Sequence, residues 1–275
     1  MIPFDMEADK AAVLEILYQS DVRLTAQAYI KEIKAKASVS ASAAKKIVRQ
    51  LIDEQELSYH YLYGSTYVEK SFLKPVRITK RYVLTPPGFQ TATTPADIDI
   101  LIAPGISFGS GQHPTTRLCL EAMEACFLEN PLGHTTPDLA GADIGTGSGV
   151  LAIAMCRSGL TACSAYEIDP VSICEAERNI ALNHLTGNIT LVETPFEVCR
   201  RRFSLICANL RFPTLKAVSD MICSSLTDTG MVILSGVREW EKDALITCYS
   251  KKGLDLVWQR DEKKWSGFVF VKKRG

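Results

Sequence analysis

Three glycines and an acidic residue form the part of the sequence best suited to chemistry. The segment Asp143-Ile-Gly145-Thr-Gly147-Ser-Gly149 lies between a strand-like and a helix-like stretch. Glycines at such a turn let backbone N–H groups approach a ligand at the amino end of the helix. A dinucleotide fingerprint would need a glycine where Val150 stands, and the carboxylate of Asp143 would repel a pyrophosphate. The turn therefore favours a ligand with positive charge.

A second acid, Glu167, follows at the end of the next strand-like stretch, 162–168. An acid roughly 20 residues beyond a glycine turn can accept hydrogen bonds from both hydroxyls of a ribose. Together with Asp143 it predicts a ligand that has a ribose and a cationic group, and S-adenosylmethionine is such a ligand. Asp169 has the pattern of a helix N-cap and of a ligand contact, and the sequence leaves both open.

The elements that must position these residues alternate between strand and helix from residue 97 onward. Strands are expected at 98–102, up to Asp143, and at 162–168, 189–192, 205–208 and 231–234; helices are expected at 115–127, 150–158, 171–183 and 213–226. The tail, 254–271, predicts two closing strands around a charged turn. We therefore predict an α/β fold whose Rossmann-like parallel sheet is covered on both faces.

The first 70 residues have a different pattern. Amphipathic helical stretches occur at 10–17, after Thr25 and after Ser42, the last ending near Leu57, and the aromatic stretch 59–68 has a turn typical of a hairpin. Three helices and a hairpin predict a winged-helix domain at 1–70. Prolines between 74 and 95 exclude a helix there, so we expect a linker with a short strand, 76–84, within 71–96 and the catalytic domain at 97–275.

The composition narrows the class of protein. Lys and Arg total 31, as do Asp and Glu, so the 275-residue chain has no global attraction to nucleic acid or membrane. Nine cysteines, none before Cys119 and none in a Cys-x-x-Cys pair, suggest neither a zinc site nor a disulfide framework. The acidic N-terminus and the absence of a long apolar run predict no secretion signal and no membrane span. A cytoplasmic protein is expected, and a homodimer is left open.

A further signature precedes the glycine turn. The string Phe108-Gly-Ser-Gly-Gln-His113-Pro-Thr115-Thr116, with residues 143–149, 167–170 and Asn209-Leu210, resembles the PrmA family, methyltransferases that act on the eleventh protein of the large ribosomal subunit. The resemblance runs from about residue 72 to the C-terminus. It implies S-adenosylmethionine as the cofactor and an amino group of a ribosomal protein as the methyl acceptor.

The resemblance also implies roles for individual residues. Residues 108–116 would cover the methionine end of the cofactor, residues 194–196 would border the adenine, and Asn209 would line the reaction centre as the candidate catalytic residue. The candidate cofactor-binding residues are Phe108, Gly109, His113, Thr115, Thr116, Asp143, Gly145, Thr146, Gly147, Gly149, Glu167, Ile168, Thr194, Pro195, Phe196 and Asn209. His113 could either brace the loop or contact the cofactor directly, and the sequence leaves both roles open. No residue is assigned as a metal ligand or as a general base.

Two features depart from the family's pattern. The N-terminal module of the family is an α/β sandwich rather than a winged helix, and no Asn-Pro-Pro-Tyr follows Ala208. A small-molecule methyltransferase that uses a winged helix for dimerisation is one alternative. Such enzymes usually have a His base after the fourth strand, and no His occurs between 205 and 226.

The other alternative is a DNA-binding regulator that senses S-adenosylmethionine. It is suggested by a basic face on the third predicted helix, formed by Lys45, Lys46 and Arg49. The acids that follow, Asp53, Glu54 and Glu56, dilute its positive field, so the sequence favours a solvated helix face over a nucleic-acid contact.

Overall fold

The structure of the chain is a computed structural model that describes residues 6–20, 22, 24–37, 39–62, 64–89, 94–105, 113–129 and 140–273. The backbone divides into two compact units, Met1–Lys74 and Pro75–Gly275. Within the described ranges, no helix has both the length and the apolar composition that crossing a bilayer requires.

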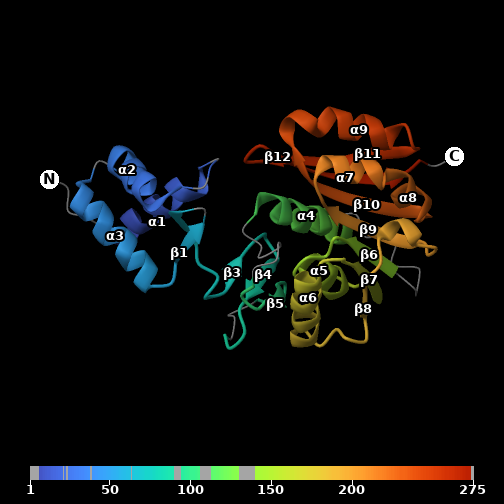
Figure 1. Ribbon diagram of the computed structural model, residues 1–275, viewed down its shortest axis with the longest axis horizontal. Helices are drawn as coiled ribbons and strands as arrows, with labels where there is room; N and C mark the ends of the chain where they lie inside the picture. Colours follow the sequence, from blue (N-terminus) through green and yellow to red (C-terminus); the bar gives the residue numbers. More distant parts are fainter. Residues whose placement is uncertain are drawn as a thin grey trace. The chain divides into compact units, whose positions relative to one another are not determined.

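The N-terminal unit consists of three helices and a hairpin (Figure 1). The helices are α1 (Met6–Tyr18), α2 (Ala26–Lys36) and α3 (Ala41–Asp53), and β1 (Leu57–Leu62) pairs antiparallel with β2 (Ser65–Lys70). Apolar side chains from all five elements form one hydrophobic core. The three helices and the hairpin predicted from the sequence are therefore present.

Side-chain caps set the starts of α2 and α3. Thr25 accepts a hydrogen bond from the N–H of Ala28, as predicted, and Ser40 accepts one from the N–H of Ala43. The third helix therefore begins after Ser40 rather than after Ser42. It also ends at Asp53, earlier than expected, because the chain turns through a left-handed backbone at Gln55 (φ 58°).

The second unit is built on a seven-stranded sheet with the order β11-β12-β10-β9-β6-β7-β8. Its strands are β6 (Ala140–Ile144), β7 (Ala162–Tyr166), β8 (Ile189–Val192), β9 (Phe203–Asn209), β10 (Leu226–Arg238), β11 (Leu254–Glu262) and β12 (Trp265–Lys272). Strands β6 to β10 pair in parallel, but β12 is antiparallel to both of its neighbours. The sheet is thus mixed rather than wholly parallel, because the tight turn at Lys263 and Lys264, both left-handed, can join only antiparallel strands.

Helices cover both faces of this sheet (Figure 1). They are α4 (Pro114–Glu124), which continues as the π-helical η1 (Ala125–Glu129), α5 (Val150–Arg157), α6 (Pro170–Leu182), α7 (Phe212–Ala217), α8 (Ser219–Ser224) and α9 (Lys242–Ser250), with short 3-10 turns η2 (Phe196–Val198) and η3 (Glu239–Glu241). Helices α7, α8 and α9 share a hydrophobic cluster with Ile206 and Ala208 of β9. Cys207 lies between these two residues, faces the opposite side and contacts Cys119 of α4.

Two helical regions differ from the prediction. The helix expected at 213–226 is two short helices that meet at Val218, and β10 already begins at Leu226. Helix α9 is missing from the prediction, since it is short and buries only Leu245 and Tyr249.

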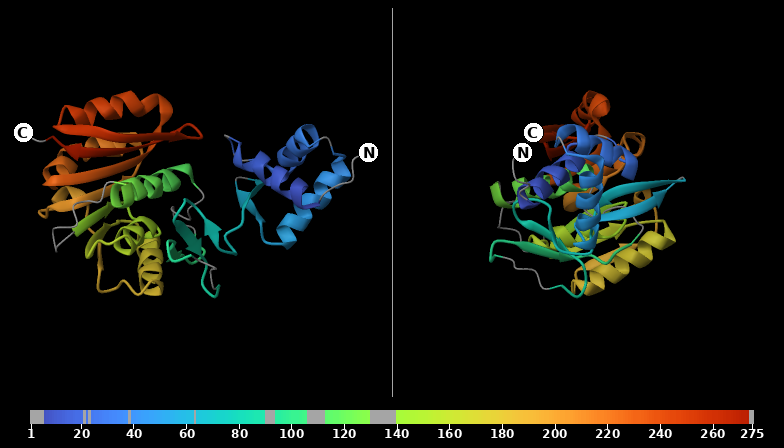
Figure 2. Two further views of the ribbon diagram at one scale, coloured as in Figure 1. Left: turned by 180° about the vertical axis from the view of Figure 1, so that it is seen from behind. Right: turned by 90° about the vertical axis from the view of Figure 1, so that its left-hand side faces the viewer.

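A second, three-stranded sheet completes the unit, with β3 (Val76–Arg77), β4 (Tyr82–Thr85) and β5 (Ile98–Leu101). The single strand expected at 76–84 is a hairpin, and β5 pairs in parallel with β4 instead of joining the large sheet. The region expected to be a linker therefore belongs to the second unit from Pro75 onward. Both ribbon views show this sheet beside α5 and α6 (Figures 1 and 2).

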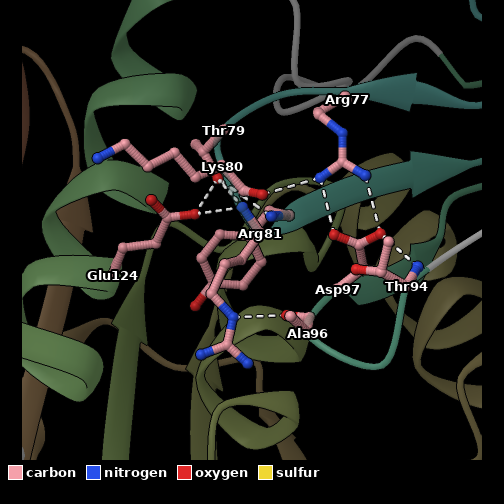
Figure 3. A network of polar contacts seen from close by, with 9 residues as sticks. Arg77, Thr79, Lys80, Arg81, Thr94, Ala96, Asp97 and Glu124 are labelled. Atoms are coloured by element: carbon pink, nitrogen blue, oxygen red, sulfur yellow. Dashed lines mark hydrogen bonds and ion pairs between the residues drawn. The ribbon is translucent and has the colours of Figure 1, made fainter.

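Polar side chains attach the small sheet to its surroundings (Figure 3). The guanidinium of Arg77 donates two hydrogen bonds of 2.8 Å to the carboxylate of Asp97. The Thr79 hydroxyl and the N–H of Arg81 donate to the carboxylate of Glu124 on α4. The bonds from Arg77, with a further one from the N–H of Thr94, hold the pKa of Asp97 well below its usual range.

Candidate functional site

The predicted site residues converge at one edge of the large sheet. The chain adds β7 and β8 on one side of β6 and then crosses back to place β9 on the other side. The direction of winding therefore reverses between β6 and β9. Ligands of open α/β sheets bind at the carboxyl ends of the strands next to such a reversal. At this edge the glycine turn follows β6, Glu167 follows β7 and Asn209 ends β9.

The glycine turn has a backbone that other residues rarely adopt. Gly145, Gly147 and Gly149 have φ values of 71°, 55° and 83°, all in the left-handed region. The N–H groups of Gly145 and Thr146 each donate to the carbonyl of Tyr166 at 2.9 Å, which ties the turn to β7. A Cβ on Gly145 would lie 2.6 Å from Cδ2 of Leu210. The turn therefore requires glycine for its backbone and for its close approach to the end of β9.

The carboxylate of Asp143 braces this turn from inside the protein. Its Oδ2 accepts hydrogen bonds from the Thr146 hydroxyl at 2.6 Å and from the N–H of Ala152 at 3.1 Å, while Oδ1 is buried without a partner. Burial raises the pKa of Asp143 to about 7, against the opposing effect of these bonds. We expected this carboxylate to contact a cationic ligand; in the structure Oδ2 holds the turn on α5, and Oδ1 is left to accept a further bond.

Glu167 connects the glycine turn to the loop that follows β7. Its Oε2 accepts from the N–H of Gly147 at 3.0 Å, and Oε1 accepts from the N–H groups of Ile168 and Asp169 at 2.8 and 3.1 Å. The side chain is half-buried and Ile168 is exposed. A carboxylate has about four acceptor positions, so these three bonds leave Glu167 able to accept one further bond at this edge.

Asp169 caps α6, one of the two roles that the sequence left open. Its Oδ2 accepts from the N–H and the hydroxyl of Ser172 at 2.9 and 2.8 Å. These bonds lower the pKa of Asp169. Its side chain is therefore already used in the helix cap.

The start of α4 carries the described end of the second signature; Phe108 and Gly109 lie outside the described residues. His113 caps α4: its Nδ1 lies 2.8 Å from the Thr115 hydroxyl and accepts from the N–H of Thr115 at 3.3 Å. Its ring packs edge-on against Trp265 at 4.9 Å. His113 thus serves as a brace, whereas the fully buried Thr116 has a hydroxyl without a hydrogen-bond partner.

Buried polar atoms without a partner are concentrated at these predicted residues. The described part of the chain has five such side-chain atoms, and three of them are Thr116 Oγ1, Asp143 Oδ1 and Asn209 Oδ1. A buried polar group left unpaired costs about 1–3 kcal/mol, so most are paired in a folded protein. One hydroxyl and two acceptor oxygens fit a ligand that has hydroxyl and ammonium groups, as S-adenosylmethionine has.

The predicted adenine-bordering residues have mixed environments. Thr194 and Pro195 are exposed between β8 and η2. Phe196 is only 2% exposed and packs edge-on against Tyr166 with ring centroids 5.0 Å apart. Its ring is therefore part of the hydrophobic core, and only its backbone and the two preceding residues are available to a ligand.

Two buried asparagines, Asn179 in α6 and Asn183 at its C-terminal cap, were not predicted from the sequence. Asn179 accepts from the N–H of Ala103 at 2.9 Å and donates to the carbonyl of Ser148, in the glycine turn, at 2.8 Å. Asn183 exchanges two hydrogen bonds, of 3.0 and 2.7 Å, with the backbone of Leu101. The signal was present in the spacing, since asparagines four residues apart occupy a helix face that also carries the buried Ala176 and Ile180.

Comparisons with known proteins agree with this arrangement. The family model for "Ribosomal protein L11 methyltransferase (PrmA)" matches residues 5–273. The protein named ribosomal protein L11 methyltransferase of Geotalea daltonii is 34% identical over 200 residues, 72% of this chain and 64% of that protein. The one of Geobacter sulfurreducens is 36% identical over 196 residues, 71% of this chain and 62% of that protein. The chain thus spans less than two thirds of the length of these relatives.

A solved structure shows the same fold. The crystal structure of a ribosomal protein L11 methylase from Lactobacillus delbrueckii subsp. bulgaricus superimposes with a TM-score of 0.64 and 26% identity, and covers 73% of this chain and 100% of that one. The second unit thus has an α/β methyltransferase fold with a large mixed sheet. The chain belongs to the ribosomal protein L11 methyltransferase (PrmA) family.

Proposed function

We propose that the chain is an S-adenosylmethionine-dependent methyltransferase that methylates an amino group of a ribosomal protein. The observation that carries the proposal is that Thr116, Asp143 and Asn209, three of the predicted site residues, have buried polar atoms without a partner. Membership of the family supplies the substrate class, because its relatives are named for a ribosomal protein. That support favours a protein acceptor over the small-molecule and regulator alternatives.

The residues of the edge would hold the cofactor by its polar groups. Asp143, whose Oδ1 has no partner, would accept a hydrogen bond from the ammonium end, and Glu167 would accept one from the ribose. When bound, S-adenosylmethionine would supply a methyl group activated by its sulfonium, whose sulfur becomes a neutral thioether on transfer. An approaching cation would also lower the raised pKa of Asp143 and favour its ionised form.

Asn209 would position the methyl acceptor. Its Oδ1 is buried without a partner at the end of β9, where the N–H of Leu210 donates to the carbonyl of Ser235 at 3.1 Å and fixes the backbone. An amide oxygen held there can accept a hydrogen bond from an amine and hold its lone pair toward the methyl group. Since transfer mainly requires alignment and exclusion of water, no covalent nucleophile is needed.

The N-terminal unit would be a winged-helix domain. Three capped helices followed by a two-stranded hairpin, with one core shared by all five elements, support that assignment. Such a domain would supply the chain with a recognition module in addition to its catalytic unit.

The test is direct transfer of a labelled methyl group. Calorimetry should show binding of S-adenosylmethionine, and a ribosomal protein fraction should become labelled in its presence. The Asn209→Ala variant should transfer the label at a rate reduced about 10- to 100-fold at saturating cofactor, a larger loss than that of its cofactor affinity, as expected for a lost positioning bond. Binding without label on any protein, with label on a small metabolite, would contradict the substrate class; no binding would contradict the methyltransferase itself.

A further inference from the structure

The charges of the N-terminal unit are segregated although the unit is neutral. Residues 1–74 contain ten basic and ten acidic residues, but residues 31–49 contain six basic residues and one acidic residue, Glu32. This basic stretch covers the end of α2 and the first part of α3. A positive surface of this kind attracts a polyanion.

The basic side chains of this stretch are exposed, and most have no internal partner. Lys36 pairs with Glu32 at 3.4 Å on the surface. In the described part of the unit, the remaining five form no ion pair or hydrogen bond through their side chains: Lys31, Lys34, Lys45, Lys46 and Arg49. We call the three on α3, Lys45, Lys46 and Arg49, the basic face. It lies opposite the buried side of the helix, so it is open to a partner.

The acids that would dilute this field are largely neutralised inside the unit. Glu54 forms an ion pair with Lys10 at 2.6 Å and accepts from Gln50 at 3.0 Å, which lowers its pKa. Glu56 forms an ion pair with Lys74. Of the three acids that follow the basic face in sequence, only Asp53 has an unpaired and exposed carboxylate. These ion pairs therefore leave the basic face less opposed by neighbouring acids than the sequence alone suggested.

The backbone around the basic face has the layout of a helix-turn-helix. Four residues, 37–40, join α2 to α3, a length typical of that motif, in which the second helix enters a groove of the duplex. The hairpin that follows extends beyond the core: Leu57 of β1 is buried, but Tyr59 and Tyr61 on the same strand face are 50% and 74% exposed. Exposed tyrosines can contact sugars and phosphates.

We propose that the N-terminal unit binds a nucleic-acid duplex, with the basic face of α3 against its phosphates and the hairpin tyrosines beside them. The partner is defined by its regularly spaced phosphodiester charges, which DNA and RNA share. This binding goes beyond the proposed methyl transfer and uses none of its residues. It gives the winged-helix domain a function that the catalytic unit does not require.

The test is fluorescence anisotropy of the full chain with labelled DNA and RNA duplexes of one sequence. Saturable binding should weaken steeply as the salt rises from about 50 to 200 mM, since phosphate contacts release counterions. The triple variant Lys45→Gln/Lys46→Gln/Arg49→Gln should bind at least about tenfold more weakly. Its slope of log affinity against log salt should be smaller by about 3, at 0.9 per lost phosphate contact with DNA.

A matched control removes the same charge elsewhere. Lys80, Lys216 and Lys251 of the second unit are exposed, and the variant that replaces all three by glutamine should bind duplexes as the unmodified chain does. Both triple variants should keep the unmodified melting temperature and cofactor affinity. Stronger binding to one duplex would identify the natural source.

Three results would overturn the proposal. The first is that neither duplex binds saturably at about 50 mM salt. The second is that both triple variants weaken binding equally. The third is that polyglutamate displaces the duplex at an equal concentration of charge. The last result would show that an acidic protein surface is the partner. Methyl transfer would persist in each case, so failure here is distinguishable from failure of the proposed enzymatic function.

Discussion

The two sheets of the second unit are stabilised in different ways. The large sheet is held by burial: β9 and β10 pack between helices, and most of their central residues are fully buried. The small sheet also buries all of β4 and Ile100 of β5, and polar contacts add to that burial: Arg77 binds Asp97, and Glu124 of α4 binds the β3–β4 hairpin (Figure 3). The difference teaches that packing between helices fixes the large sheet beneath the glycine turn, whereas the small sheet combines burial with a few replaceable polar side chains.

The largest effect on cofactor affinity is expected at Asp143, where the large sheet meets the glycine turn. Asp143→Ala removes the brace from Thr146 and Ala152 and the free Oδ1, so S-adenosylmethionine should bind about 10- to 100-fold more weakly. Asp143→Asn keeps an acceptor oxygen for the brace and should retain more of the affinity. Calorimetry measures both. Equal affinities for the alanine variant and the unmodified chain would show that the turn does not need this side chain.

The next largest effect on cofactor affinity is expected at Asn179, which links the segment after β5 to the glycine turn. Asn179→Asp keeps the acceptor for the N–H of Ala103 but, when ionised, repels the carbonyl of Ser148. We expect cofactor affinity to fall about tenfold at pH 8, for the loss of one hydrogen bond in the turn, and to recover at acid pH, where the neutral acid can donate again.

The matched control is Asn183→Asp, which contacts Leu101 in the small sheet but no residue of the glycine turn. It should reduce the melting temperature without a pH-dependent change in cofactor affinity. If both variants lost affinity with the same pH profile, Asn179 would have only a general stabilising role.

The free energy of unfolding should depend on pH through Asp143, at the end of β6 in the large sheet. Burial raises the folded-state pKa of Asp143 to about 7, while an exposed Asp in the unfolded chain titrates near 4. The folded state therefore binds the extra proton, and the free energy of unfolding should fall as the pH rises from about 4 to 7. Asp143→Asn should lack this component. Urea denaturation at several pH values measures the difference between the two proteins, which would stay constant with pH if Asp143 titrated normally.

A smaller effect is expected from the attachment of the small sheet to α4. Glu124→Ala leaves the Thr79 hydroxyl and the N–H of Arg81 without their acceptor and should lower the free energy of unfolding by about 1–3 kcal/mol. Glu124→Gln keeps an acceptor oxygen and should cost less. Urea denaturation gives both values, and cofactor affinity should change less than it does for Asp143→Ala.

The smallest effect is expected at Arg77. Lys cannot form the two parallel bonds that Arg77 makes with Asp97, but it keeps a positive charge beside that carboxylate, and the Arg77 side chain itself is 47% exposed. Arg77→Lys should therefore lower the melting temperature slightly and by less than Glu124→Ala, as differential scanning calorimetry would show. A larger loss than at Glu124 would mean that the hairpin, and not its contact with α4, fixes the small sheet.

The amino-acid sequence by itself determined the local features of this protein. The left-handed glycines at 145, 147 and 149, the caps at Thr25 and Asp169, the turn between β11 and β12 and the alternation of strands with helices could all be predicted. Each depends on residues within a few positions, because backbone sterics and side-chain caps act over that range. The convergence of the glycine turn and Glu167 follows from the same alternation.

Only the tertiary structure decided how distant segments use their polar groups. It separated β3 to β5 into a second sheet, turned Oδ2 of Asp143 inward, bridged Ala103 to Ser148 through Asn179 and paired Glu54 with Lys10. A hydrogen bond or ion pair of this kind depends on which segments meet after the core is packed. Its free energy is set by burial and geometry between residues far apart in the chain, which local residue patterns do not specify.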